Sequence, residues 1–286
     1  MTAATLKDIF SRHLRARGAR RYAGKDLPLA VVLSFCVTAL VVAASLLPGL
    51  FTSFNPFIGN TADKLLAPSA QHWFGTDHLG RDMLARVVFG TWSSVTSAMT
   101  AVSIGLAVGG LIGLMSGFLG RWVDFALSRF IDVLLAIPNF LLAVLIVSSF
   151  GFETINVAIA TGVSAVAVFA RLMRSEVLKT RAAAFVEASR LAGGSRWHIL
   201  VRHILPNAYR SVLALAVLQF GSSILTISAL AFLGYGDPPP ASDWGQLIAA
   251  GKDYPSSPWL VLYPALAIVI TVLSFNRISR WIRQKN

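Results

Sequence analysis

Few side chains in this sequence could hold a metal ion or catalyse a reaction. His72, Asp77 and His78 form a histidine and carboxylate set of the kind that binds zinc. A zinc site needs a compact set of ligands, and these residues lie in a glycine-rich segment that supplies no complete set. We therefore interpret them as loop residues. No histidine lies within an apolar segment, so we expect no catalytic residues and no metal site in this chain.

Asp132 is the acidic residue that an apolar segment carries near its start. Such a residue is a candidate for a transport pathway. Arg129 precedes it by one helical turn, so an ion pair on the helix surface is the interpretation that we adopt. The sequence contains no Gly-x-x-x-x-Gly-Lys-[Ser/Thr] pattern, so it carries no P-loop for ATP. We also expect no other cofactor in this chain. If ATP drives its activity, another subunit must bind the nucleotide.

The elements that position these residues are apolar helices. Of the 286 residues 55% are hydrophobic and 13% charged, against about 25% charged in soluble proteins. An apolar helix of about 20 residues spans a bilayer. The sequence therefore predicts an all-α, polytopic membrane protein with a basic N-terminal segment (1–26), a transmembrane domain (27–276) and a C-terminal tail (277–286). We expect six transmembrane helices, near residues 27–50, 92–119, 125–150, 154–173, 210–233 and 259–275.

Proline and glycine give two of these segments specific features. Pro138 predicts a kink in the third segment. Glycines at every fourth position of the second segment predict close packing against another helix. Cys36 lies in the first segment and, as the single cysteine, forms no intrachain disulfide. The glycines are Gly105, Gly109, Gly113 and Gly117.

The basic residues predict which side of the membrane each loop occupies. Short loops rich in Lys and Arg stay in the cytoplasm. Of the 25 Lys and Arg residues, all except Lys64, Arg81, Arg86 and Lys252 lie in one alternating set of segments. That set holds both termini and the polar segment 174–209, which we therefore expect in the cytoplasm. The net charge of +12 then reflects topology and contact with anionic lipids, rather than nucleic-acid binding.

The polar segment 174–209 separates the fourth and fifth apolar segments. Its Gly193-Gly194 pair can end one short helix and allow another to begin, so we predict a helix–turn–helix outside the membrane. The spacing resembles the EAA loop of ABC importer permeases, with Ser189 in place of the usual second alanine. This resemblance implies that the segment couples the permease to an ATPase. The matching residues are Glu187, Ala188, Ser189, Gly193, Leu205 and Pro206.

Two further segments flank apolar helices on the opposite side. In the first, Gly75 and Gly80 permit tight turns, and the carboxylates of Asp77 and Asp82 can accept hydrogen bonds from backbone N–H groups or Arg81. In the second, Pro238 to Pro240 favour a stiff extended run, and Trp244 could anchor at the membrane interface.

Together these segments resemble the second permease subunit of the dipeptide, oligopeptide and nickel class of ABC importers. The resemblance covers residues 28–276. After Phe275-Asn276 the sequence departs from the family, which usually continues with Gly-Asp. The matching residues are His72, Gly75, Thr76, Asp77, Gly80, Arg81 and Asp82 in the first segment, and Phe232, Leu233, Gly234, Gly236, either Pro238 or Pro239, Trp244 and Gly245 in the second.

The resemblance implies a type I ABC importer transmembrane domain in a bacterial inner membrane. It implies a homologous permease partner in a heterodimer, two cytoplasmic ATPase subunits that bind ATP and Mg, and a periplasmic or lipid-anchored substrate-binding protein. The expected cargo is a dipeptide or oligopeptide, with nickel or a metal chelate as the alternative. A secondary transporter would need ion-coupling groups near the bilayer midplane, where the sequence offers little charge.

Overall fold

The computed structural model describes residues 28–238 and 240–284, so the basic segment 1–26 lies outside the described residues. These residues form helices without strands, apart from an isolated bridge between Thr76 and Asp82. The helices are α2 (Leu29–Leu46), α3 (Met83–Ile104), α4 (Gly110–Leu119), α5 (Arg121–Ala136), α6 (Asn139–Phe150), α7 (Thr154–Arg181), α8 (Ala184–Leu191), α9 (Arg196–Ile199), α10 (Leu205–Phe232), α11 (Trp244–Gly251) and α12 (Trp259–Gln284).

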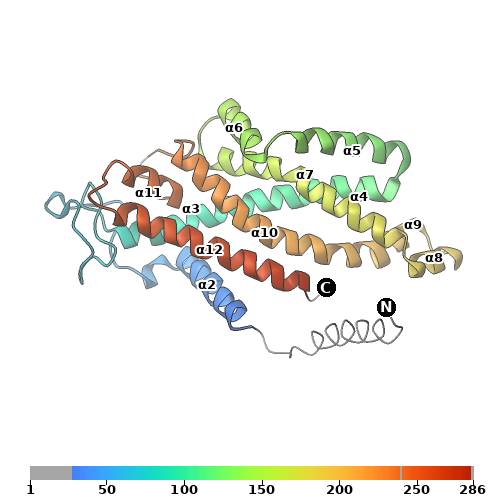
Figure 1. Ribbon diagram of the computed structural model, residues 1–286, viewed down its shortest axis with the longest axis horizontal. Coiled ribbons are helices and arrows are strands. Elements are labelled where there is room, and N and C mark those ends of the chain that lie inside the picture. The colour runs from blue at the N-terminus through green and yellow to red at the C-terminus, as the bar shows by residue number, and fades with distance from the viewer. Residues whose placement is uncertain (1–27, 239, 285–286) are drawn as a thin grey trace, which may run out of the picture.

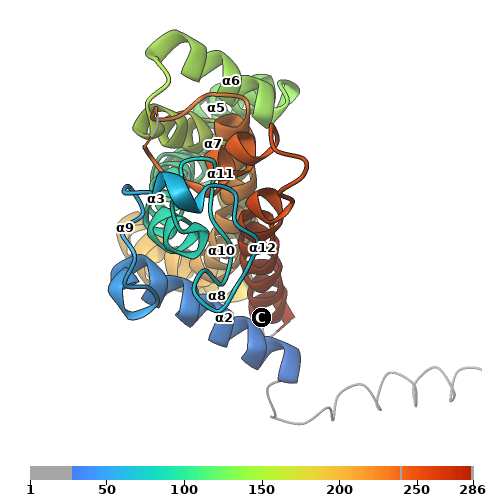
Figure 2. The same cartoon turned by 90° about the vertical axis from the view of Figure 1, so that its left-hand side faces the viewer.

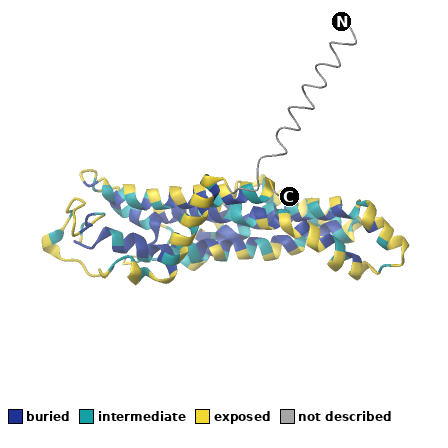
Figure 3. Cartoon of the chain, turned by 90° about the horizontal axis from the view of Figure 1, so that it is seen from below, coloured by how far each residue is buried: buried dark blue, intermediate teal, exposed yellow. Residues whose placement is uncertain are grey.

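The helices form an elongated bundle (Figure 1). Residues 51–82 and α11 lie at one end, and α8 and α9 lie at the other. The view along the bundle from the first end places α5 and α6 on one side of it and α2 on the opposite side (Figure 2). Buried residues run along the middle, whereas exposed residues cover the outer faces and both ends (Figure 3).

Within the described residues, five continuous helical segments are long and apolar enough to cross a membrane. Two of them join shorter helices through a π-helical turn, at Gly105–Gly109 between α3 and α4 and at Leu200–Ile204 between α9 and α10. The third segment predicted from the sequence is not one continuous helix. It consists of α5 and α6, which are bent by 89° relative to each other and count as a sixth span only if taken together.

Pro138 explains this break, which is larger than the predicted kink. Proline lacks a backbone N–H and excludes the helical conformation at the preceding residue. Ile137 is accordingly extended, with φ −92° and ψ 126°. The helix therefore ends at Ala136 and resumes at Asn139.

Two boundaries differ from the sequence prediction. The second span begins at Met83 rather than near residue 92, because the Asp82 carboxylate caps α3 by accepting the N–H of Ala85 at 2.7 Å. At the other end of the chain, α12 continues without interruption past residue 276 to Gln284. Its last turns pack on neighbouring helices, and the Ser279 hydroxyl donates to the carbonyl of Ala214 at 2.6 Å.

The glycine spacing in the second span correctly predicted a packing face. A Cβ added at Gly109 would lie 2.3 Å from the carbonyl oxygen of Val166, and one at Gly113 would lie 2.3 Å from that of Ala170. Gly105 and Gly117 also face α7 closely. The α4 and α7 backbones therefore approach to a distance that only glycine permits, and the two helices pack closely along this face.

We expect Gly113→Ala to lower the stability of the chain by about 1–3 kcal/mol, because the added methyl overpacks the contact with α7. Gly110→Ala is the matched control on the same helix. Its Cβ would lie 3.8 Å from its nearest neighbour, the Cε of Met173, so this change should be neutral or stabilising. Thermal unfolding of the two detergent-solubilised variants tests the difference, and equal melting temperatures would contradict it.

Candidate functional site

The first candidate site is the finger, which we define as residues 182–204 at one end of the bundle (Figure 1). Helix α8 ends at Leu191, and the chain turns at Gly193, where φ is +85°. The N–H of Gly194 donates to the carbonyl of Ser189 at 2.9 Å. Ser195 then caps α9 by accepting the N–H of His198 at 3.2 Å. The helix–turn–helix prediction is therefore confirmed.

The finger presents both charged and apolar side chains to its surroundings. Glu187 and Ala188 are exposed, while Ser189 is half-buried. Leu191 is 84% exposed and Trp197 73% exposed. Arg190, Arg196 and Arg202 of the same segment are also exposed. Large apolar side chains left exposed beside charged ones favour a protein–protein contact.

The structure separates the sequence-predicted finger residues into two groups. Glu187, Ala188, Ser189 and Gly193 lie in α8 and the turn after it. Leu205 and Pro206 lie in the first turn of α10, directly after the π-helical turn. Pro206 has no N–H to donate to the preceding turn of this continuous helical segment, and the π-helical turn Leu200–Ile204 lies where that hydrogen bond is missing. Leu205 and Pro206 thus connect the finger to the bundle rather than forming its tip.

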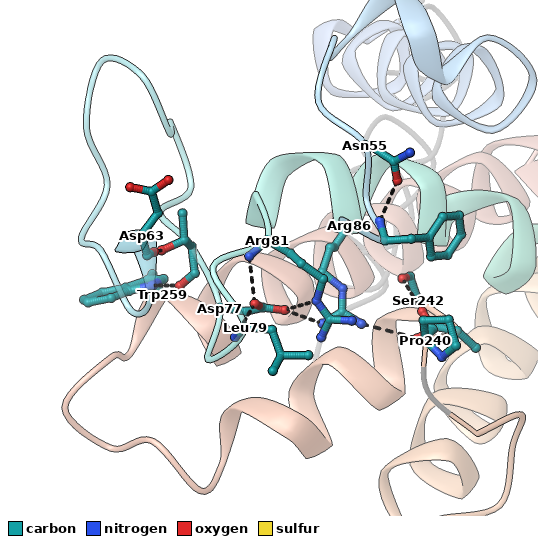
Figure 4. Close-up of polar contacts among 12 residues, drawn as sticks. Asn55, Asp63, Asp77, Leu79, Arg81, Arg86, Pro240, Ser242 and Trp259 are labelled. Atoms are coloured by element: carbon teal, nitrogen blue, oxygen red, sulfur yellow. Dashed lines mark hydrogen bonds and ion pairs between the residues drawn. The ribbon is translucent and has the colours of Figure 1, made fainter. Parts of the chain in front are cut away.

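At the opposite end, which the basic residues predict to face outward, Asp77 is the centre of an outer cluster, which we define as Asp77, Arg81 and Arg86 (Figure 4). Asp77 Oδ1 accepts the N–H groups of Leu79 at 2.8 Å and Arg81 at 3.0 Å. Asp77 Oδ2 accepts Arg81 Nε at 2.7 Å and Arg86 Nη1 at 2.8 Å. All three side chains are buried. The predicted contact with Arg81 is confirmed, whereas Arg86 was not among the motif residues.

The surrounding turn depends on glycine at two positions. Gly75 has φ +72° and Gly80 has φ +74°, a region that other residues rarely occupy. The Thr76 hydroxyl donates to the carbonyl of Asp63 and accepts the N–H of Leu66. Trp259 Nε1 donates to the carbonyl of Thr76 at 3.2 Å, which attaches the turn to α12. The predicted fixed structure before the second span is therefore present.

The two histidines of this loop have different partners. His72 Nδ1 lies 2.9 Å from Asp82 Oδ2, and the His78 ring stacks on Tyr254 with centroids 5.2 Å apart. Across residues 28–284, with 239 left out, no group of three His, Cys, Asp or Glu side chains is arranged to hold a metal ion.

Burial and the neighbouring charges set the pKa values in this loop. Burial alone would raise the pKa of Asp77, but the Arg81 N–H and the two guanidinium groups outweigh it and lower the pKa below its ordinary value. Burial lowers the pKa of His78, and the charges of Arg81 and Arg86 add to this effect against the attraction of Asp77. His78 is therefore neutral at pH 7, and Asp77 is ionised.

Trp244 is buried at the start of α11, a helix that was not predicted from the sequence. This side chain is 1% exposed, and its Nε1 donates to the carbonyl of Val87 at 3.0 Å. The expectation that Trp244 anchors at the membrane interface is therefore wrong, because the indole N–H is bonded inside the chain. Asp243 caps α11 by accepting the N–H groups of Gly245 and Gln246 at 2.8 and 3.1 Å. Aspartate is a preferred N-cap residue, so Asp243 is the sequence feature from which the start of α11 could have been predicted.

We expect the stability of the outer end to depend on pH through Asp243. Burial raises the pKa of this carboxyl to about 6 from 3.8, against the opposing N–H groups of Gln246 and Gly245. The folded state therefore binds this proton more tightly, and on the order of 3 kcal/mol of stability is lost as pH rises from about 4 to about 6. Asp243→Asn keeps the cap and should remove this dependence between pH 4.5 and 7.5 in thermal unfolding. An unchanged pH profile would contradict the assignment.

Asp132 is ion-paired, but its principal partner differs from the expected one. Arg129 Nη1 lies 4.0 Å from Asp132 Oδ2, whereas Arg171 Nη2 of α7 lies 2.8 Å from Asp132 Oδ1. Arg174 of α7 similarly binds Asp124 of α5, at 2.6 and 2.8 Å. These ion pairs join α5 to α7. The sequence could not predict them, because the partners are 39 and 50 residues apart in the chain.

Known proteins that are similar to this chain belong to the class of permeases that the motifs at both ends of the molecule resemble. Residues 109–286 match the family model described as "Binding-protein-dependent transport system inner membrane component". The chain is 38% identical to a dipeptide transport system permease of Alkalihalophilus pseudofirmus over 91% of this chain and 85% of the relative. It is 34% identical to a probable D,D-dipeptide transport system permease of Escherichia coli K12, over 91% and 87%. A glutathione transport system permease of Pectobacterium atrosepticum is 37% identical over 76% and 72%.

Solved structures show the same fold. An amino acid ABC transporter superposes with a TM-score of 0.56 at 17% identity, covering 70% of this chain and 94% of that one. An inward-facing methionine ABC transporter gives a TM-score of 0.55 at 18% identity, over 70% and 97%. The all-α fold is that of type I ABC importer membrane domains. On sequence and fold together, this chain belongs to the family of inner-membrane permease components of binding-protein-dependent ABC importers.

Proposed function

We propose that this chain is one of two homologous permease subunits in an ATP-driven importer of short peptides. Relatives named as dipeptide and glutathione permeases support the cargo. In this proposal the chain binds no ATP itself. Two cytoplasmic ATPase subunits hold ATP and Mg, and a periplasmic or lipid-anchored protein delivers the peptide.

The observation that carries the proposal is the exposed finger at the end of the bundle opposite the outer cluster (Figure 1). Leu191 and Trp197 offer apolar surface to an ATPase, and Glu187 offers a carboxylate for a basic group. Closure of the ATPases on ATP displaces a finger that is continuous with α10. The spans then shift between inward-open and outward-open states, with α4 and α7 moving as one unit.

Uptake by a reconstituted complex tests the proposal. The chain, its partner permease and the ATPases are placed in liposomes, and the loaded binding protein is added on the outer side. We expect peptide accumulation that requires ATP, together with ATP hydrolysis that the loaded binding protein stimulates. Peptide accumulation that persists without ATP would contradict an ATP-driven importer.

Cysteine labelling tests the orientation, which the distribution of basic residues predicts. Arg196 in the finger and Asp253 near the outer cluster are both exposed. In a chain whose Cys36 is replaced, a membrane-impermeant maleimide should label Asp253→Cys in intact cells and Arg196→Cys only after the membrane is opened. Labelling of Arg196→Cys in intact cells would invert the topology.

A further inference from the structure

A cavity of about 540 Å³ lies beside the outer cluster. His78, Arg81 and Arg86 line it from α3 and the segment before it, and Asp237 and Gln246 line it from the segment around α11. Its volume falls within the range of about 300–1,000 Å³ that is typical of small-molecule sites. Figure 4 shows Arg81 and Arg86 around Asp77 and a dashed contact from Arg86 towards residues 240–242.

Two buried polar atoms beside this cavity have no hydrogen-bond partner. Arg86 is 4% exposed, and its Nε has no acceptor. The Oε1 atom of Gln246 has no donor, although its Nε2 donates to the carbonyl of Asp237. These are the two buried side-chain atoms without partners in the part of the chain that the structure describes. Folded proteins rarely leave such atoms unpaired. Both atoms are covered by the protein, so a molecule in the cavity would pair with them after small shifts of the Arg86 and Gln246 side chains.

Side chains of opposite charge line the cavity. Arg81 and Arg86 share the single carboxylate of Asp77, which leaves one positive charge in excess. The carboxylate of Asp237 also lines the cavity, and its Oδ1 accepts the N–H of Thr154 at 3.0 Å. The rest of the lining includes the apolar residues Phe152, Ala231, Pro238 and Ala250.

We propose that this cavity is a reception site for a short zwitterionic peptide. The peptide carboxylate accepts from Arg86 Nε, and its ammonium group donates to Asp237 and to Gln246 Oε1. The apolar lining contacts the peptide side chains. Asp237 repels a multiply charged anion, and a purely apolar ligand leaves Arg86 unpaired. The assignment rests on the proposed function and adds a selective step in the permease itself.

Direct binding tests the site without the delivery protein. Radiolabelled alanyl-phenylalanine is equilibrated with the permease–ATPase complex in lipid nanodiscs from which the binding protein is absent. We expect saturable binding, with N-acetylated and C-amidated alanyl-phenylalanine at least tenfold weaker, because each loses a charge-assisted contact. Asp237→Asn should weaken binding of the free dipeptide about tenfold and remove the discrimination against the N-acetylated form. Asp253→Asn, an exposed aspartate that does not line the cavity, is the matched control and should bind like the wild type.

Arg86→Lys provides a second variant that keeps a positive charge beside Asp77 but lacks Nε. It should bind the free dipeptide more weakly while discriminating less against the C-amidated form. If the wild-type complex transports peptide but shows no saturable binding, or if Asp237→Asn binds like the wild type, the site assignment is wrong while the import function stands. Weaker docking of the binding protein to Asp237→Asn, with unchanged peptide affinity, would likewise overturn it. Loss of ATP-dependent uptake by the wild type would instead contradict the proposed function.

Discussion

Gly193→Val should reduce peptide uptake at least tenfold while the chain still inserts into the membrane. The backbone of Gly193 has φ +85°, and a β-branched residue in that region is strained by about 1–3 kcal/mol. A Cβ at this position would meet no atom of the chain within 4 Å, so the backbone alone causes the effect within this subunit. The strained turn misorients α8 relative to α9, and the ATPase contact is lost. ATP-dependent uptake and co-purification of the ATPase measure the result.

Gly193→Asn is the matched control, because asparagine tolerates positive φ better than other residues that bear a Cβ. It should retain most of the uptake. Glu187→Ala should have a smaller effect than Gly193→Val, since it removes one charge-assisted contact without changing the turn that orients both helices. Normal uptake and normal ATPase binding in both Gly193→Val and Glu187→Ala would mean that the finger is an ordinary loop.

Asp77→Ala should destabilise the outer end by about 3–5 kcal/mol, because it leaves two buried guanidinium groups without their carboxylate. Arg81 and Arg86 are each 4% exposed, so water cannot replace the lost acceptor without opening the loop. The change also removes the acceptor for the N–H groups of Leu79 and Arg81. We expect a lower amount of chain in the membrane and a lower melting temperature in detergent.

Asp253→Ala is the control for this change, because Asp253 is an exposed aspartate near the same end. It should leave both the membrane level and the melting temperature close to those of the wild type. If Asp77→Ala melted at the wild-type temperature, the buried ion pairs of the outer cluster would contribute no net stability. The cluster would then have to be explained by its role in binding alone.

The roles of the finger residues in coupling remain predictions, whereas their placement is established. The structure puts Glu187, Ala188, Ser189 and Gly193 in and after α8, as the spacing implied. It also shows that Leu205 and Pro206 belong to the start of α10. The outer residues Thr76, Asp77, Gly80, Arg81 and Asp82, with Gly75, form the turn before α3, and a role for them in transport is likewise a prediction.

The features that the sequence determined by itself are those that depend on local chemistry. Apolar length defined the spans, because a bilayer requires a certain run of apolar helix. Pro138 ended a helix because it has no N–H to donate, and Gly193 marked a turn because only residues tolerant of positive φ fit there. The glycines before residue 119 identified a packing face because their spacing places them on one side of a helix.

The tertiary structure alone decided which residues meet across the bundle. Arg171 rather than Arg129 is the close partner of Asp132, and Trp244 finds its acceptor at Val87. Each of these contacts joins residues far apart in the chain. Local periodicity tells which side of a helix is apolar but not which helix lies against it. The cavity beside Arg86 arises in the same way, because the outer loop, α3 and α11 form its walls only after the helices have packed.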